Sequence, residues 1–308
     1  MEANAYRDVI EMMPKHIAEK LAAVDGGVTK NAVEIRLRAD KPCAVYSGST
    51  PYFINLRGSA VTELESGCVS FSQSEIKSVV AHMCEYSLYK KEDELRQGFV
   101  AIKGGHRIGV CATCLQSGVI DVSAISSVSI RIAREHRGCA AGVFGATMTD
   151  GMCSLLIAGP PLSGKTTIVR DLSRMLSSKP LYKKAVVIDE RGELASVCDG
   201  VPVLDTGTCT DVLDGYRRKH GFDIAIRTLS PDVIVCDELG DESDFECIEN
   251  AGKSGVKVLA TVHAGSIGEL VKRKQVSRCI DSGIFEYVVF LDTFPNIGRV
   301  TNVHRVVS

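Results

Sequence analysis

Long apolar runs are missing from this sequence of 308 residues. No stretch reaches the roughly 18 uninterrupted apolar residues that a membrane-spanning helix needs. The nearest candidate, residues 138–162, is interrupted by Thr147, Thr149, Asp150 and several glycines. The N-terminus has the spacing of an amphipathic helix, without the continuous apolar core of an export signal. We therefore expect a cytoplasmic protein that is peripheral at the cytoplasmic membrane at most.

An excess of charge of either sign is also missing. The 36 basic and 38 acidic residues give a formal net charge of -2, which provides no overall attraction to nucleic acid or to an anionic membrane. Aromatic residues make up only 6% of the chain, so few surfaces are present on which bases could stack. We therefore expect no nucleic-acid partner.

The cysteine pattern lacks a second pair of metal ligands. Twelve cysteines without an export signal indicate a reducing compartment in which thiols stay unpaired. Cys111 and Cys114 form a single CxxC, whereas a structural zinc site needs four ligands. Residues three apart in the strand expected there point to opposite faces, which disfavours shared ligation. A metal or redox role for the pair is not favoured.

The first half of the chain has the pattern of a small α+β domain, which we place at residues 1–140. The whole chain, with 308 residues of which 45% are hydrophobic, is long enough for two packed domains. Alternating apolar residues predict strands, a Gly-Gly pair predicts a hairpin, and Ser72 precedes a helical pattern. The expected strands cover residues 33–38, 42–47, 98–115 and 126–135, and the expected helix covers residues 72–95.

The second half, which we place at residues 141–308, has the pattern of an α/β domain. Its strands SLLIAG, AVVID, VIVCD, VKVLATV and YVVFLD are nearly continuous apolar runs separated by helical patterns. Such runs predict a mostly parallel sheet that is covered by helices on both faces. The turn FPNIG and the segment RVTNVHRVV predict an antiparallel hairpin at the sheet edge. The glycine-rich residues 138–151 are expected to link the domains.

The segment GPPLSGKT matches the phosphate-binding pattern GxxxxGK[ST]. Its glycines let backbone N–H groups surround a phosphate, and the following helix adds the positive end of its dipole. A strand before it and a helix after it disfavour an incidental glycine-rich turn. Lys165 would contact the β- and γ-phosphates of ATP, Thr166 would ligate Mg²⁺, and Thr167 would contact the inner phosphates. The candidate nucleotide-binding residues are Gly159, Pro160, Pro161, Leu162, Ser163, Gly164, Lys165, Thr166 and Thr167.

Two acidic residues follow the strand VIVCD, at the edge where a parallel sheet presents its ligands. Asp237 is suited to hold Mg²⁺ through water, and Glu238 to polarise the water that attacks the γ-phosphate. The pair therefore predicts ATP hydrolysis rather than binding alone. The alternative is that Asp237 and Glu238 only cap the next helix.

Two further strand ends carry candidate groups. The cluster Asp189, Glu190 and Arg191 could steer water and metal or bring Arg191 to a phosphate, or it could be an ordinary solvated charge cluster. Thr261 and His263 end another strand and could sense the γ-phosphate. The alternative for His263 is a histidine whose hydrogen bonds are satisfied in the core.

Five arginines of the first half of the chain lie within its expected strands. If the protein forms a ring, some of them could reach the nucleotide of a neighbouring subunit, although ordinary surface arginines are an equal alternative. A motor acting on nucleic acid would instead need them in one basic stripe beside aromatic residues. These arginines are Arg36, Arg38, Arg107, Arg131 and Arg134.

The motifs in their order resemble the stage III sporulation protein AA family, within the type II/IV secretion ATPase group of RecA-like P-loop enzymes. The resemblance covers nearly the whole chain. It rests on the P-loop together with GGHRIGV, SIRIARE, DERGE, DVLDG, RTLSPDVIVCDELG and HAGS.

The resemblance implies a RecA-like core and a hexameric ring ATPase of endospore-forming bacteria, acting in the mother cell at a membrane channel complex. Residues 159–167 become the Walker A motif, and Asp237 and Glu238 the Walker B motif with its catalytic acid. Glu190 and Arg191 become the acidic-box region, and His263 the histidine-box residue. The sequence lacks the tetracysteine zinc motif of many pilus-assembly ATPases, which counts against a pilus motor.

Motifs and resemblance together predict a Mg²⁺-dependent ATPase that forms a ring and energises a sporulation-associated membrane channel or secretion complex. One alternative is a switch whose nucleotide occupancy remodels a surface for a membrane partner. The other is a P-loop motor acting on nucleic acid.

Overall fold

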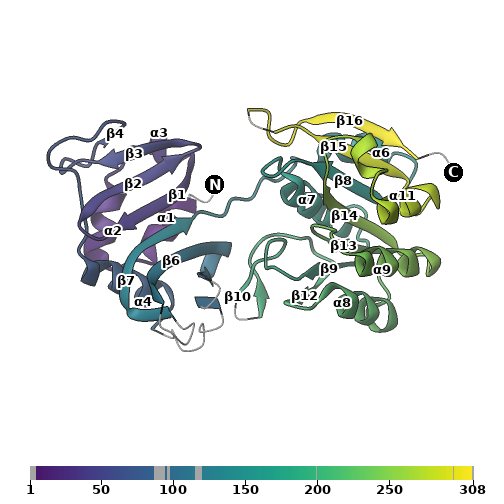
Figure 1. Cartoon of the computed structure of the whole chain (residues 1–308), viewed down its shortest axis with the longest axis horizontal. Helices are drawn as coiled ribbons and strands as arrows, with labels where there is room; N and C mark the ends of the chain where they lie inside the picture. The colour runs from purple at the N-terminus through teal and green to yellow at the C-terminus, as the bar shows by residue number, and fades with distance from the viewer. Residues whose placement is uncertain are drawn as a thin grey trace. The chain divides into compact units, whose positions relative to one another are not determined.

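The computed structural model describes residues 5–86, 94–95, 98–114, 120–198, 200–293 and 295–306. The chain divides into two compact units, Met1–Arg134 and Glu135–Ser308, drawn from purple to teal and from teal to yellow in Figure 1. Each unit has its own buried core. Among the described residues, no helix is both long and apolar enough to cross a membrane.

Unit 1 contains a seven-stranded antiparallel sheet in the order β4-β3-β2-β1-β7-β6-β5. The strands are β1 (Ala32–Arg38), β2 (Lys41–Ser47), β3 (Thr50–Ile54), β4 (Ala60–Val61), β5 (Phe99–Ile102), β6 (His106–Cys114) and β7 (Ile120–Arg131). The helical elements are α1 (Ala5–Glu11), α2 (Lys15–Ala22), α3 (Gly26–Thr29), α4 (Gln73–Met83) and the 3₁₀ turn η2 (Lys103–Gly105). The predicted α+β class of the first half is confirmed.

The sheet of unit 1 buries one face. In β1, Ile35 and Leu37 are fully buried and alternate with the partly exposed Glu34 and Arg36, as the two-residue period of a strand requires. The buried residues share one core with side chains of α1, α2 and α4, which lie against the same face of the sheet (Figure 1). The opposite face is therefore the polar one.

Local signals account for most of unit 1. The strands expected at residues 33–38 and 42–47 are β1 and β2, and the Gly-Gly pair forms the turn between β5 and β6, where Gly104 has a φ of 85°. The helix expected after Ser72 begins with a capping box between Ser72 and Glu75. Of the residues assigned to these elements, Leu115 and residues 87–93 lie outside the described ones. The N-terminal pattern forms two helices rather than one, because Pro14 lies between α1 and α2.

Unit 2 contains a seven-stranded sheet in the order β12-β9-β13-β14-β8-β15-β16, in which every pairing is parallel except that of β15 with β16. The strands are β8 (Leu155–Gly159), β9 (Ala185–Asp189), β12 (Thr210–Asp214), β13 (Val233–Cys236), β14 (Lys257–His263), β15 (Tyr287–Leu291) and β16 (Val300–Arg305), with a separate hairpin of β10 (Val197–Cys198) and β11 (Val201–Pro202). The predicted parallel sheet and its antiparallel edge hairpin are confirmed, whereas the edge strand β12 was not predicted.

Helices cover both faces of this sheet. They are α6 (Ala141–Thr147), α7 (Lys165–Ser177), α8 (Arg218–Ile224), the π-helix η3 (Ala225–Leu229), α9 (Glu242–Lys253), α10 (Ile267–Leu270) and α11 (Lys274–Asp281). In β8, Leu155 and Ile157 pack with α6 and α7, whereas Leu156 and Ala158 share a core with α8, α9 and α11. Because both faces are buried, the strands are apolar at successive positions.

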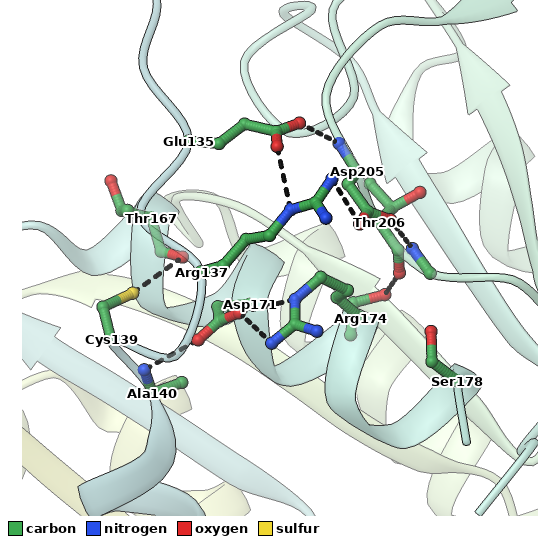
Figure 2. Close-up of polar contacts among 12 residues, drawn as sticks. Glu135, Arg137, Cys139, Ala140, Thr167, Asp171, Arg174, Ser178, Asp205 and Thr206 are labelled. Atoms are coloured by element: carbon green, nitrogen blue, oxygen red, sulfur yellow. Dashed lines mark hydrogen bonds and ion pairs between the residues drawn. The ribbon is translucent and has the colours of Figure 1, made fainter. Parts of the chain in front are cut away.

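The start of unit 2 is attached to α7, as Figure 2 shows. The backbone N–H of Ala140 donates to Asp171 Oδ2 at 2.9 Å, and Arg174 forms a 2.7 Å ion pair with the same carboxylate. The side chain of Val143 in α6 is buried in the core that contains α7. The glycine-rich residues 138–151, expected to link the domains, are thus part of unit 2.

A second group of contacts ties the first residues of unit 2 to the loop before β12. The backbone N–H of Asp205 donates to Glu135 Oε1 at 2.7 Å, and Arg137 forms a 3.1 Å ion pair with the Asp205 carboxylate (Figure 2). The division between the units consequently falls after Arg134 rather than after residue 140. The assignment of the units as domains remains a proposal.

We expect His106 to make the stability of unit 1 depend on pH. The ring is buried, its Nδ1 accepts the N–H of Ala133 at 2.9 Å, and burial lowers its pKa to about 4. The folded pKa lies below the unfolded value of about 6.5, so this stability is present above pH 6.5 and is lost as the pH falls toward 4. In urea unfolding, the free energy of unfolding of the wild type should fall by up to about 3 kcal/mol between pH 6.5 and pH 4 because of this histidine. His106→Asn should lack that part of the decrease.

The matched control is His304→Asn, which replaces an exposed histidine of β16 and should keep the wild-type pH dependence. Parallel pH profiles for wild type and His106→Asn would contradict the assignment.

Candidate active site

The segment 159–167 forms a loop between β8, which ends at Gly159, and α7, which begins at Lys165. A Cβ on Gly159 would lie 2.5 Å from Ser163 Oγ, so only glycine fits there. Gly164 has a φ of 86°, a conformation that favours glycine. Leu162 has a φ of 63°, which is rare for a bulky residue, and its side chain is 87% exposed. The sequence pattern therefore folds into the strand, loop and helix that it predicts.

The side chain of Lys165 lies inside this loop. Its ammonium group donates to the carbonyl oxygens of Gly159 at 3.0 Å and Pro160 at 2.8 Å. Burial lowers the pKa of the ammonium, and the carboxylates of Asp237 and Glu238 oppose that shift. The ammonium is thus held by two backbone carbonyl groups of its own loop.

Thr166 connects the loop to the end of β13. Its hydroxyl donates to Asp237 Oδ2 at 2.6 Å, and the buried hydroxyl of Thr261 in β14 donates to Asp237 Oδ1. Both oxygens of the Asp237 carboxylate therefore accept from hydroxyl groups, one in the first turn of α7 and the other in β14. In the sheet, β14 lies between β13 and β8, and the three strands are parallel. Their carboxyl ends therefore meet at one edge of the sheet.

The alternative role of Asp237 and Glu238 as helix caps is wrong. Helix α9 begins at Glu242 with Asp241 as its N-cap residue. Asp244 Oδ2 accepts the backbone N–H groups of Gly240 at 2.9 Å and Asp241 at 3.1 Å. The helix is capped by its own acidic residues, so the pair at 237–238 is left facing the loop.

Glu238 is oriented by groups on three sides. Its backbone has a φ of 46°, a sparsely populated conformation that functional sites often retain, and its N–H donates to Thr261 Oγ1 at 2.8 Å. One carboxylate oxygen pairs with Arg191 Nη1, and the other lies 3.3 Å from His263 Nε2. The side chain is therefore fixed beside the phosphate loop.

His263 joins the lysine to the glutamate. Its Nδ1 lies 3.2 Å from Lys165 Nζ and its Nε2 lies 3.3 Å from Glu238 Oε1. An ammonium can only donate, so Nδ1 accepts, and a neutral ring then carries its proton on Nε2 and donates to Glu238. The side chain is 41% exposed, so the alternative of a core histidine is wrong.

The turn after β9 is held by Asp189 and Arg170. The buried Asp189 carboxylate accepts the backbone N–H groups of residues 193–196 at 2.8 to 3.3 Å. Arg170 of α7 donates to the carbonyl oxygens of Glu193 and Leu194. Asp189 is thus engaged by its own turn, which is incompatible with the expected role in steering water or metal.

The same turn brings Glu190 and Arg191 to the site. Arg191 contacts Glu238, as described above, and Glu190 Oε2 lies 3.6 Å from Arg218 Nη2. Both line a small cavity together with the two acidic residues that follow β13. Its lining residues are Ile188, Asp189, Glu190, Arg191, Glu193, Arg218, Asp237 and Glu238.

Arg218, at the start of α8, was not predicted from the sequence. Its side chain is 11% exposed, forms a 2.5 Å ion pair with Asp244, and donates to the carbonyl oxygen of Asp237 at 2.6 Å. The sequence shows two adjacent arginines at 217–218 and gives no sign that only the second is buried. Arg170 was missed because the carbonyl groups that it contacts lie far away in the chain, and Asp244 because the same is true of its cation, Arg218.

The residues present fit a polyphosphate and Mg²⁺. The Ser163 hydroxyl is buried without a hydrogen-bond partner among the described residues, and a Cβ would fill the loop at Gly159. The loop opens onto the first turn of α7, where backbone N–H groups favour anions. The Thr166 hydroxyl and the Asp237 carboxylate supply the oxygen donors that Mg²⁺ prefers.

A family model described as sporulation stage III, protein AA matches residues 7–306. The chain belongs to the sporulation stage III protein AA family. The resemblance indicated by the motifs is therefore confirmed. Stage III sporulation protein AA of Bacillus subtilis (strain 168) is 29% identical over 302 residues, covering 96% of this chain and 94% of that protein.

Solved structures show the fold that this sporulation stage III protein AA family member shares with proteins of low sequence identity. The pilus retraction motor PilT with bound ADP superimposes with a TM-score of 0.59 at 18% identity, covering 88% of this chain and 77% of PilT. The ATPase DotB of Yersinia pseudotuberculosis superimposes with a TM-score of 0.55 at 15% identity, covering 84% and 70%. The predicted RecA-like P-loop core with an N-terminal α+β unit is confirmed.

Four arginines of this family member share the polar face of the unit 1 sheet. Arg107 pairs in register with Arg131, which pairs with Glu34, and alternate residues of a strand point to one side. Arg134 lies beyond β7 and donates to the backbone carbonyl oxygens of Ala32 and Thr29. The four arginines are Arg36 and Arg38 of β1, Arg107 of β6 and Arg131 of β7.

Aromatic rings lie beside this row of arginines. The Arg36 guanidinium lies 5.7 Å from the Tyr46 ring centre, and that of Arg107 lies 5.3 Å from the Phe99 ring centre. The nucleic-acid alternative needs such a row with rings on which bases can stack. Both rings are already contacted by arginines of the same chain, which weakens that alternative.

The CxxC pair is described only in part. The Cys111 side chain is exposed in β6, and the side chain of Cys114 lies outside the described residues. The expectation of no metal or redox role for the pair stays a prediction.

We expect Arg218→Ala to destabilise unit 2 by roughly 3 kcal/mol, because it leaves the Asp244 carboxylate buried without its cation. Arg217→Ala is the matched control, since Arg217 is exposed and exposed substitutions change stability by about 0.5 kcal/mol or less. Urea unfolding of both variants makes the comparison. Equal stability of the two variants would show that the buried ion pair has no such role.

Proposed function

We propose that this protein is a Mg²⁺-dependent ATP hydrolase. One observation carries the proposal: the Thr166 hydroxyl of the phosphate loop donates to Asp237, and Glu238 stands next to that pair at the carboxyl end of β13. A phosphate loop alone supports binding, whereas an acidic pair beside it supports hydrolysis. Family membership and the fold of ATPases such as DotB agree with this activity.

The loop holds the triphosphate of ATP. Lys165 exchanges the carbonyl oxygens of Gly159 and Pro160 for oxygens of the β- and γ-phosphates, while the loop amides and the start of α7 contact the remaining oxygens. Thr166 and Asp237 hold Mg²⁺, which neutralises charge on the phosphate oxygens when bound. Thr167 lies on the side of the inner phosphates.

Glu238 polarises the attacking water. Its carboxylate is fixed by Arg191 and His263, so the acceptor is aligned before the water arrives, and a positioned base contributes about 10² to 10⁴ in rate. His263 contacts Lys165 as well. When a γ-phosphate moves Lys165, the His263 ring can therefore shift and change the position of the Glu238 carboxylate. Glu190 holds Arg218, and Arg191 supplies a cation for charge that develops on the γ-phosphate.

The ATPase acts as a ring-forming motor, most simply a hexamer, on the cytoplasmic side of a membrane channel or secretion complex in sporulation. The support is family membership and the shared fold with PilT, which is a pilus retraction motor. In such a ring, the arginines on the polar face of unit 1 are candidates to contact the nucleotide of a neighbouring subunit. The two units are the two domains that would move against each other.

We expect Glu238→Gln to bind ATP with Mg²⁺ as the wild type does, yet to lower turnover at least about a hundredfold, because an amide cannot take the proton of water. Phosphate release and ATP binding are measured on the same preparation. Glu246→Gln, which changes an exposed carboxylate of α9, is the matched control and should keep wild-type turnover. Near-normal hydrolysis by Glu238→Gln would remove Glu238 from the catalytic role.

Light scattering on the purified protein, with and without ATP and Mg²⁺, tests the ring. We expect a mass of six chains when ATP and Mg²⁺ are present. A monomer under both conditions would contradict both the ring mechanism and the role of the unit 1 arginines at a neighbouring subunit. The proposed hydrolysis would still be tested by the preceding experiment.

A further inference from the structure

The turn between β15 and β16 is built onto the phosphate loop. The backbone N–H of Gly298 donates to the carbonyl oxygen of Ser163 at 3.0 Å. A Cβ on Gly164 would lie 3.4 Å from Ile297 Cγ2 and 3.5 Å from Gly298 Cα. The turn therefore lies directly against the Ser163 to Gly164 peptide, at the point where α7 begins.

Internal hydrogen bonds hold the described residues of this turn, 292–293 and 295–299. The N–H of Asp292 donates to the carbonyl oxygen of Arg299 at 2.8 Å, and that of Asn296 to the carbonyl oxygen of Thr293 at 2.8 Å. The Thr293 N–H donates to Asp292 Oδ1 at 2.8 Å. The position of Ile297 is consequently set by the protein chain itself, although its side chain is 56% exposed.

The strand order gives the direction in which a bound nucleotide runs. Strands β13 and β14, which carry Glu238 and His263 at or just beyond their ends, lie on one side of β8, and β15 lies on the other. A triphosphate with its γ-phosphate beside Glu238 crosses the loop after β8. Its nucleoside then extends toward the β15 side, where the turn with Ile297 lies.

We propose that Ile297 is the contact for the nucleobase of the bound nucleoside triphosphate; this subsite rests on the proposed function. Single exposed apolar residues are ordinary on protein surfaces, so the position of Ile297 matters more than its exposure. It lies beside Gly164 on the nucleoside side of the phosphate loop, with the exposed Leu162 in the same loop. Covering an aliphatic side chain with the flat face of a base removes apolar surface from water.

An aliphatic contact of this kind touches the face of a base and makes no hydrogen bond to its edge. Ile297 therefore contributes equally to the binding of adenine and guanine nucleotides, and it contributes nothing to the binding of a polyphosphate that lacks a nucleoside. These two consequences separate a base contact from a structural support of the loop.

Calorimetry on the full chain with Mg²⁺ tests the subsite with three probes: non-hydrolysable analogues of ATP and GTP, and inorganic tripolyphosphate. We expect Ile297→Ala to weaken both nucleotide analogues by the same factor of about ten, as expected for losing part of a buried aliphatic contact, and to leave tripolyphosphate binding unchanged. Ile297→Leu, which keeps the apolar surface, should bind both nucleotide analogues with wild-type affinity. Val201→Ala, at an exposed aliphatic residue of β11, should change none of the three.

Two outcomes overturn the subsite while the proposed function stands. One is equal weakening of tripolyphosphate and nucleotides by Ile297→Ala, which would make the turn a support of the loop only. The other is unchanged nucleotide binding, which would place the base elsewhere. A wild-type protein that binds neither nucleotides nor tripolyphosphate overturns the proposed function, and the subsite with it.

Discussion

The hydrogen bond from the Thr166 hydroxyl to the Asp237 carboxylate is the contact on which the rest of the site depends. It joins the phosphate loop after β8 to the end of β13, although β14 lies between these strands in the sheet. Thr261 of β14 donates to the same carboxylate, so three strand ends meet at one acidic group. The arrangement requires the strands to stay in register, which the apolar side chains buried on both faces ensure.

A second set of charged residues supports the site through bonds to the backbone and to one another. Asp189 closes the turn after β9 with its own backbone, Arg170 ties that turn to α7, and Arg218 holds the end of β13 against Asp244. Charges buried in this way are stable only when they are paired. The turn that carries Glu190 and Arg191 is therefore held by Asp189 and Arg170, which have no part in the proposed chemistry.

The sequence predicted what is local and missed what is distant. The phosphate loop, the strand ends at Asp237 and His263, and the capping box at Ser72 are each encoded by residues close together in the chain. The burial of Arg218 rather than Arg217 and the attachment of Ala140 to α7 depend on partners dozens of residues away. Asp189 was assigned the wrong role because its bonds to the backbone of residues 193–196 require a turn that the sequence pattern did not show. His263 shows the limit: its spacing placed it at a strand end, but only the strand order places its ring between Lys165 and Glu238.

The central claim is that Lys165, Thr166, Asp237 and Glu238 form an ATP-hydrolysing centre that uses Mg²⁺. The most direct test is the rate of phosphate release from ATP by the purified full chain, measured with Mg²⁺ and again after the metal is chelated. The account predicts steady turnover with Mg²⁺, none after chelation, and none in Asp237→Asn under either condition. Phosphate release that continues without Mg²⁺, or that survives Asp237→Asn, would contradict it.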